Sequence, residues 1–272
     1  MDNRPIGIFD SGVGGLSAVR AMYEREIPES FIYYGDTARV PYGNRSREEI
    51  TRFSLQDVRF LRSHDLKAIL IACNTITVNS IDALREANPD LPIVGVVDAA
   101  AAAAAKAGKN GRFGIISTVS TAQSGVYAEK LKALRPGAEV YSQGCPKFVP
   151  LIESGHIAPD DAELLPAVEE YLAPIKAFGV DTLILGCTHY PLIREAVQNY
   201  MGPDVTLIDS GAESIDAVLS ILRERDALAA PGTEVSRRFY CSGRLEEFEH
   251  VAEMFLDRSI RGLAEEIDIT KF

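Results

Sequence analysis

Short apolar runs alternate along the chain with longer segments in which apolar residues recur at helical spacing. The apolar runs predict strands at residues 6–9, 31–34, 68–72, 93–97, 113–116, 139–142, 182–185, 205–208 and 238–240. The amphipathic segments predict helices, for example at 47–62, 124–134, 162–178 and 245–256. Strands that alternate with helices form parallel sheets covered by helices. Nearly continuous apolar strands such as 68–72 are typical of a sheet buried on both faces, so the pattern predicts the α/β class.

One pattern occurs twice, at residues 66–75 and 180–189. Each copy has an apolar strand that ends in a small residue, followed by a cysteine, polar side chains and a helix. The copies are too far apart for a solenoid repeat, but they suit two similar α/β halves. Because open α/β sheets bind ligands at the carboxyl ends of their strands, Cys73 and Cys187 are both candidates for a ligand site.

A run of seven alanines at 99–105 lies between Asp98 and Gly108. We expect Asp98 to be the N-cap of a helix here and Gly108 to be its C′ residue. We interpret the segment as a short helix with a face of small residues. The alternative is a crossover between the two halves, packed closely because alanine occupies little volume.

Composition narrows the classes of function. The 272 residues suffice for one large α/β domain or two small ones. The 28 Lys and Arg residues against 39 Asp and Glu give a net charge of −11, which argues against nucleic acid or an anionic membrane as a partner. The negative net charge is compatible with a small anionic substrate, since a binding site inside an acidic protein can still be locally positive. No apolar stretch approaches the ~20 residues of a membrane helix.

Cysteine spacing and the N-terminal residues bear on the compartment. The four cysteines are far apart, which predicts free thiols rather than a disulfide framework or a metal site. The first residues lack the basic and apolar segments of a signal peptide. Free thiols are typical of a reducing environment, so we expect a cytoplasmic protein.

Two loops that follow predicted strands carry candidate binding residues. In the loop 10–15, glycines allow backbone N–H groups to approach a ligand, and the following helix N-terminus favours an anion. The alternative is a tight turn capped by Asp10. The polar loop 35–43 is typical of a protein surface, yet loops after parallel strands also face the ligand crevice.

The two cysteine segments are the sharpest chemical features. A thiol at a helix N-terminus has a lowered pKa, although a free cysteine more often serves as a small buried residue. His189, two residues after Cys187, can accept or relay a proton near neutral pH. Glu153 is a candidate acid–base or cation-binding residue, or a surface charge. Thr118 and Thr121 offer hydroxyls to a carboxylate, or only an N-cap to the next helix.

A pair of thiols in two similar halves suits the inversion of a stereocentre. Proton transfer needs a base on one face of the carbon and an acid on the other, and the roles exchange in the reverse reaction. One thiolate and one thiol meet this need. Asp10 is placed to serve Cys73, and His189 to serve Cys187.

Motifs spread along nearly the whole chain point to one family. They are Asp10-Ser11-Gly12-Val13-Gly14-Gly15, Gly35-Asp36-Thr37 with Pro41-Tyr42-Gly43, Ala72-Cys73-Asn74-Thr75, Val149-Pro150-Leu151-Ile152-Glu153 and Gly186-Cys187-Thr188-His189-Tyr190-Pro191. Through them the sequence resembles the aspartate/glutamate racemase family. The resemblance implies a racemase that needs neither metal nor cofactor, interconverts L-glutamate and D-glutamate, and supplies D-glutamate for peptidoglycan.

The resemblance also implies roles for single residues. Cys73 and Cys187 match the two acid–base residues, Cys73 acting on the D-isomer and Cys187 on the L-isomer. Glu153 and His189 match residues that assist proton transfer. The positions that match substrate contacts are Asp10, Ser11, Tyr42, Gly43, Asn74, Thr75, Thr188 and His189.

The fold that the resemblance implies has two pseudo-symmetric α/β domains with mainly parallel sheets around a central active-site cleft. In this chain the first domain would comprise residues 1–97 and 210–272, and the second would comprise 98–209. The family is usually homodimeric, so we expect a homodimer.

Three other functions stay open. A related racemase acting on aspartate would use the same thiols and differ in its contacts to the side-chain carboxylate. A thiol hydrolase or transferase would use Cys187 as nucleophile with His189, which leaves Cys73 unexplained. An amino-acid-binding protein without catalysis would need only the cleft between two domains.

Overall fold

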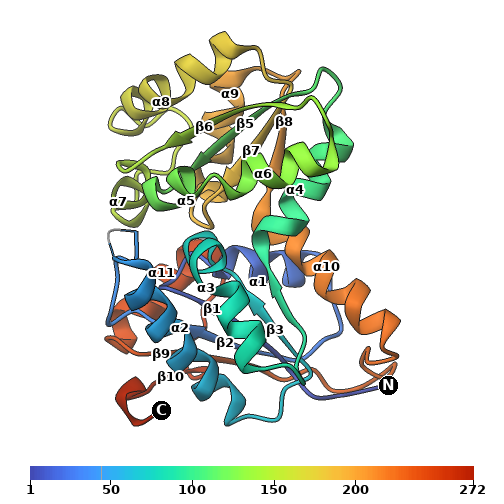
Figure 1. Cartoon of the computed structure of the whole chain (residues 1–272). Coiled ribbons are helices and arrows are strands. Elements are labelled where there is room, and N and C mark those ends of the chain that lie inside the picture. The colour runs from blue at the N-terminus through green and yellow to red at the C-terminus, as the bar shows by residue number, and fades with distance from the viewer. Residues whose placement is uncertain (44) are drawn as a thin grey trace.

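The computed structural model describes residues 1–43 and 45–272 and contains two β-sheets, one above the other in Figure 1. The lower sheet has six strands in the order β10-β9-β2-β1-β3-β4, and each of these neighbouring pairs is parallel. Its strands are β1 (Ile6–Asp10), β2 (Phe31–Gly35), β3 (Ala68–Ile71), β4 (Ile93–Gly95), β9 (Arg237–Cys241) and β10 (Ala264–Glu266). Its helices are α1 (Leu16–Glu24), α2 (Arg47–Arg62), α3 (Asn74–Ala87), α10 (Ser210–Glu224), α11 (Leu245–Leu256) and η2 (Ile269–Lys271).

The upper sheet has four strands in the order β6-β5-β7-β8, again with parallel neighbours. Its strands are β5 (Arg112–Ser117), β6 (Glu139–Gly144), β7 (Thr182–Gly186) and β8 (Thr206–Asp209). The helices of this part are α4 (Val96–Ala107), α5 (Val119–Ser124), α6 (Val126–Leu134), α7 (Phe148–Glu153), α8 (Leu164–Phe178), η1 (Tyr190–Ile193) and α9 (Arg194–Met201). Across the described residues, no helix combines the length and apolar character that a membrane span requires.

The expected α/β class with two mainly parallel sheets is confirmed, and the differences are local. The strand expected at 93–97 ends at Gly95, because α4 already begins at the next residue. The helix expected at 124–134 begins later, because Gly125 adopts a left-handed conformation with φ of 68° and separates α5 from α6. The three-residue strand β10 was not expected from the pattern. The two domain boundaries stay a prediction.

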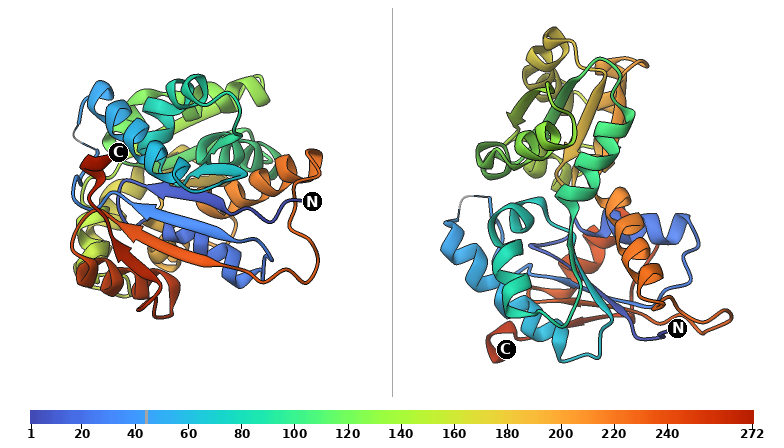
Figure 2. Two further views of the ribbon diagram at one scale, coloured as in Figure 1. Left: turned by 90° about the horizontal axis from the view of Figure 1, so that it is seen from below. Right: turned by 45° about the vertical axis from the view of Figure 1, so that its right-hand side comes forward.

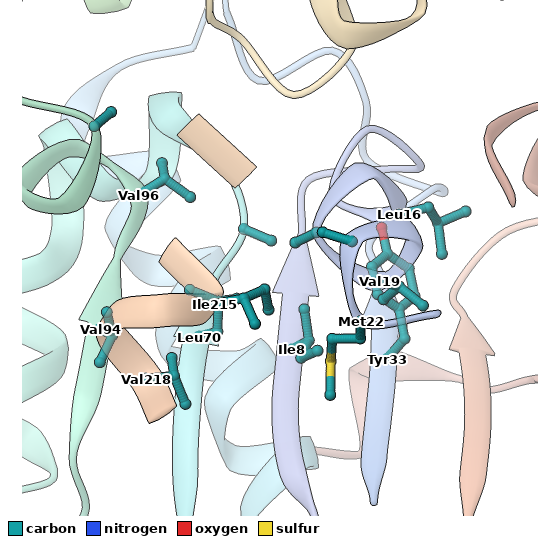
Figure 3. Packing of buried hydrophobic residues seen from close by; sticks show 14 of the residues in the cluster. Ile8, Leu16, Val19, Met22, Tyr33, Leu70, Val94, Val96, Ile215 and Val218 are labelled. Carbon is teal, nitrogen blue, oxygen red and sulfur yellow. The ribbon is translucent and has the colours of Figure 1, made fainter. Parts of the chain in front are cut away.

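Alternate residues of the central strands in the lower sheet pack on opposite faces. Ile8 and Leu70 lie on the face covered by α1 and α10, and Figure 3 shows Ile215 of α10 beside Leu70. Phe9 and Ile71 lie on the other face in a cluster with α2 and α3. Burial on both faces explains why these strands are apolar along their whole length.

The alanine-rich segment is a helix and also a connection between the sheets. α4 leads from β4 to β5, and α10 leads from β8 back to β9. Ala100, Ala101 and Ala104 are fully buried in the cluster that also contains Ile215 of α10. Their small side chains allow α4 and α10 to pack closely, and these two helices form the junction between the two parts in the right-hand view of Figure 2.

The expected N-cap Asp98 is wrong, whereas Gly108 lies directly after the helix, as expected. Gly95 is the N-cap, and Asp98 lies inside the first turn. The positive end of the helix dipole stabilises the Asp98 carboxylate there. This carboxylate also pairs with Lys130 at 2.8 Å. Gly108 follows the last helical residue, but its φ of −63° is not left-handed. The helix begins earlier than expected, at Val96, and its first two residues, Val96 and Val97, are buried.

Candidate active site

The carboxyl ends of the two sheets face each other, and loops from both sheets touch there. The backbone of Gly14, after β1, lies so close to the residues after β7 that a Cβ on it would be 2.5 Å from Nδ1 of His189 and would also overlap Thr188. Thr75, after β3, has its Oγ1 3.1 Å from Oγ1 of Thr118, after β5. The strand-end residues selected from the sequence are therefore brought into one region.

Cys73 is the N-cap of α3 and lies directly after β3. Because β1 and β3 are neighbours in the sheet, Cys73 lies beside Asp10 at the end of β1. Its Sγ is 3.5 Å from the hydroxyl of Ser11, and its side chain is 5% exposed. Burial and the charge of Asp10 raise the pKa of Cys73, and they outweigh hydrogen bonds from Ser11 and the backbone of Ile76. The expected lowering at the helix start is wrong for this thiol, which rests protonated.

Asp10 is almost completely buried, and its two carboxylate oxygens have different surroundings. Oδ2 accepts a hydrogen bond from the backbone N–H of Gly12 at 3.0 Å. Oδ1 has no hydrogen-bond partner among the described residues. Burial raises the pKa of Asp10, while His189 opposes this increase. A buried acceptor without a partner is costly, so Oδ1 is suited to a donor that a ligand brings.

Cys187 is the first of three residues whose side chains are linked by hydrogen bonds. Its Sγ lies 3.9 Å from Nδ1 of His189, and Nε2 of His189 lies 3.0 Å from Oε1 of Glu153 at the end of α7. The side chain of Cys187 is buried, whereas that of Glu153 is 46% exposed. The rings of His189 and Phe255 of α11 are nearly perpendicular, with their centroids 5.5 Å apart. Cys187 does not begin an α-helix: a turn and η1 follow it.

The charge on His189 follows from these contacts. Burial lowers the pKa of His189, but the hydrogen bonds and charges of Cys187 and Glu153 outweigh it and raise the pKa to about 10. His189 is therefore protonated at neutral pH, and its Nδ1–H can donate to Cys187. The two thiols differ as a result: Cys73 has a carboxylate beside it, and Cys187 has an imidazolium.

Hydroxyl and amide groups surround the thiols. Thr118 is the N-cap of α5, where its Oγ1 accepts from the N–H of Thr121 at 3.4 Å, so the capping role of Thr118 is confirmed and its contact to a carboxylate stays a prediction. Its hydroxyl also meets Thr75 and Thr121. Thr188 is buried beside Gly14. Asn74 is buried next to Cys73.

The loop with Tyr42 and Gly43 is held by a buried polar network. The hydroxyl of Tyr42 donates to the carboxylate of Asp36. Arg39 pairs with Asp36 and with Asp57, at 2.6 Å in each case. The Tyr42 hydroxyl is therefore already occupied, and a contact from this loop to a ligand would come from its backbone. Asn44, the next residue, lies outside the described residues.

Two further residues reach the site without having been singled out from the sequence. Tyr127 of α6 and Ser210 at the start of α10 both bond to the amide of Asn74. Ser210 directly follows β8, which is the signal that identified Cys73 and Cys187. Tyr127 lies inside a helix and carries no such signal.

Known proteins resemble this chain in both sequence and fold. The family model for Asp/Glu/Hydantoin racemase matches residues 11–218. The glutamate racemase of Streptococcus gordonii is 44% identical over 270 residues, which is 99% of this chain and 100% of that protein. Glutamate racemase isoform RacE1 of Bacillus anthracis has a TM-score of 0.92 at 38% identity, with 98% of both chains covered. The glutamate racemase of Francisella tularensis, solved in complex with D-glutamate, has a TM-score of 0.90 at 35% identity, with 100% of both chains covered. The resemblance is confirmed, and the chain belongs to the Asp/Glu/Hydantoin racemase family.

Proposed function

We propose that this amino-acid racemase interconverts L-glutamate and D-glutamate by proton transfer with two thiols and without a cofactor. The observation that carries the proposal is the placement of Cys73 and Cys187. Each thiol follows a strand at the edge where the two sheets face each other, and each has its own charged neighbour, Asp10 or His189. Two such groups satisfy the need for a base and an acid on opposite faces of one carbon.

The reaction balances with the two thiols alone. The thiolate of one cysteine takes the α-proton, so the Cα–H bond breaks and an S–H bond forms. The thiol of the other cysteine then delivers its proton to the opposite face of the carbanion, and its S–H bond breaks. By the family resemblance, Cys187 takes the proton from L-glutamate and Cys73 takes it from D-glutamate.

The α-proton of an amino acid is weakly acidic, so the site must stabilise the carbanion. Buried, preorganised charges act most strongly when water is excluded. We assign the unpartnered Oδ1 of Asp10 to the substrate ammonium group. His189, oriented by Glu153, controls the proton on Cys187. The residues assigned to the substrate carboxylates are Ser11, Tyr42, Gly43, Asn74, Thr75, Thr118, Thr121 and Thr188.

We further propose the domain boundaries, the oligomeric state and the cellular compartment of the enzyme. The two domains comprise residues 1–97 with 210–272 and residues 98–209. The enzyme acts as a homodimer in the cytoplasm, where D-glutamate is a precursor of peptidoglycan. The assignments of domain boundaries, dimer and compartment rest on the family resemblance.

One arrangement in the site also fits a second function. Cys187, His189 and Glu153 follow one another in the order of a nucleophile, its base and an orienting carboxylate. A thiol hydrolase or transferase would use this order and would form an acyl-enzyme. It would give no role to Cys73 and its neighbours Asp10 and Ser11.

The test is circular dichroism of L-glutamate with purified protein in D2O, without an added cofactor. The expected result is decay of the optical activity together with entry of deuterium at the α-carbon. Decay with aspartate but not with glutamate would change the substrate. Absence of decay with both amino acids, together with a trapped acyl-enzyme, would replace the proposal by the thiol-nucleophile function.

A further inference from the structure

A chain of three hydrogen bonds crosses the buried junction between the two sheets. The hydroxyl of Tyr127 lies 2.6 Å from Oδ1 of Asn74. Nδ2 of Asn74 lies 3.1 Å from Oγ of Ser210, and that Oγ lies 3.0 Å from the backbone oxygen of Leu185. None of the three side chains is more than 2% exposed. This series of hydrogen bonds therefore connects α6, α3, α10 and β7 without contact to bulk water.

The direction of each hydrogen bond follows from its last acceptor. The backbone oxygen of Leu185 can only accept, so the single hydroxyl hydrogen of Ser210 points to it. Ser210 must then accept from Asn74, which places the amide nitrogen of Asn74 toward Ser210. The amide oxygen consequently faces Tyr127, whose hydroxyl must donate. The network thus determines which end of the Asn74 amide is nitrogen and which is oxygen.

This orientation matters because Asn74 directly follows Cys73 and begins α3. An amide nitrogen has two hydrogens, and only one is used by Ser210. The other has no partner among the described residues. If the amide were turned over, an acceptor would replace this donor, and it would repel a carboxylate instead of binding one.

We propose that Tyr127 is a positioning residue for substrate, which acts together with Ser210 by holding the Asn74 amide so that its second N–H binds a carboxylate of glutamate. The role rests on the proposed function. The series of hydrogen bonds ends at Leu185, two residues before Cys187, and it contacts α3 at Asn74, one residue after Cys73. None of its hydrogen bonds involves either thiol.

The decisive variant is Tyr127→Phe, which removes the donor and keeps the ring. The amide oxygen of Asn74 then loses its partner, and the amide is free to turn over. We expect KM for both enantiomers to increase about tenfold, equivalent to about 1.4 kcal/mol, while kcat changes little because neither thiol is touched. The Kd of D-glutamate, measured by calorimetry, should increase by the same factor. An unchanged KM and Kd would overturn the proposal.

A double-mutant cycle separates positioning from general stability. If Tyr127 acts through Asn74, then Tyr127→Phe has no further effect on kcat/KM in an Asn74→Ala background. Fully additive losses would overturn the proposal. Ser210→Ala removes the acceptor for the amide nitrogen and should also increase KM, so the test stands if Tyr127→Phe folds poorly.

The matched control is Tyr190→Phe. Tyr190 is equally buried, and its hydroxyl donates to the backbone oxygen of Cys145 at 3.3 Å, away from Asn74. This variant should lose stability comparably while KM stays unchanged; an equal increase of KM would overturn the specific role of Tyr127. A wild-type protein that does not racemise glutamate would instead overturn the proposed function, whereas wild-type racemisation with an unaltered Tyr127→Phe enzyme would overturn only the positioning role.

Discussion

Replacement of Gly14 by alanine tests whether the contact between the two strand-end loops is needed for catalysis. A Cβ at this position would lie 2.5 Å from Nδ1 and 2.7 Å from Cε1 of the His189 ring. Gly14 does not have the positive φ that would by itself disfavour alanine. The effect of the substitution therefore arises from overlap with His189 and Thr188.

The size of the effect follows from the distances. Non-bonded heavy atoms are comfortable at roughly 3.5 Å, so the ring and the loop must separate by about 1 Å. His189 cannot retreat freely, because Phe255 meets its ring and Glu153 holds its Nε2. A misplacement of about 1 Å in a catalytic group can cost about 100-fold in rate. We therefore expect Gly14→Ala to lower kcat/KM about 100-fold.

The assay is racemisation followed by circular dichroism from both enantiomers. The equilibrium constant between enantiomers is unity, so kcat/KM must decrease by the same factor in both directions. The matched control is Gly7→Ala in β1, where a Cβ would lie 2.7 Å from Leu66 in the core. This control should lose about 1–3 kcal/mol of stability and keep its kcat/KM. A folded Gly14→Ala protein with wild-type kcat/KM would refute the reasoning.

Four other outcomes are expected. Cys73→Ser and Cys187→Ser should each lower kcat/KM for racemisation by about 10²- to 10⁴-fold with the fold intact; wild-type rates of racemisation in either variant would exclude the two-thiol reaction. His189 has a pKa raised to about 10, so it loses its proton as the pH rises through that value, and activity that needs the imidazolium declines there. Glu153→Gln removes one cause of the raised pKa, so this alkaline decline should move to lower pH, and a pH–rate profile with an unmoved decline contradicts the role of Glu153. Ala101→Leu should overpack the contact between α4 and α10 and lower the free energy of unfolding by about 1–3 kcal/mol, measured by urea denaturation.

Local patterns predicted the elements that depend on local physics. The helices expected at 47–62 and 245–256 have these bounds in the structure. Ser46 caps the first of them by accepting from the N–H of Glu49, a spacing visible in the sequence. By contrast, β10 is short and half exposed, and it forms only because β9 offers it an edge. The pairing of β9 with β2 joins residues from opposite ends of the chain, which no local pattern encodes.

In the site, too, the features set by local sequence were predicted, and those set by distant residues were not. Asp10, Cys73 and Cys187 were identified because each follows an apolar strand, and strand ends of parallel sheets meet at one edge. The pKa of Cys73 was predicted in the wrong direction, because burial and the charge of Asp10 depend on the neighbouring strand rather than on the helix that follows. Tyr127 was missed because it lies inside a helix and its partner, Asn74, is 53 residues away along the chain.

The strand order of the lower sheet has a consequence for synthesis on the ribosome. β2 pairs with β9, which comes near the end of the chain, whereas the upper sheet needs only residues 112–209. A nascent chain therefore carries the open edge of β2 until residues 237–241 have emerged. An open edge is a template for pairing with strands of other molecules. A nascent or truncated chain that ends before residue 237 would contain both cysteine loops and still expose β2 to intermolecular aggregation.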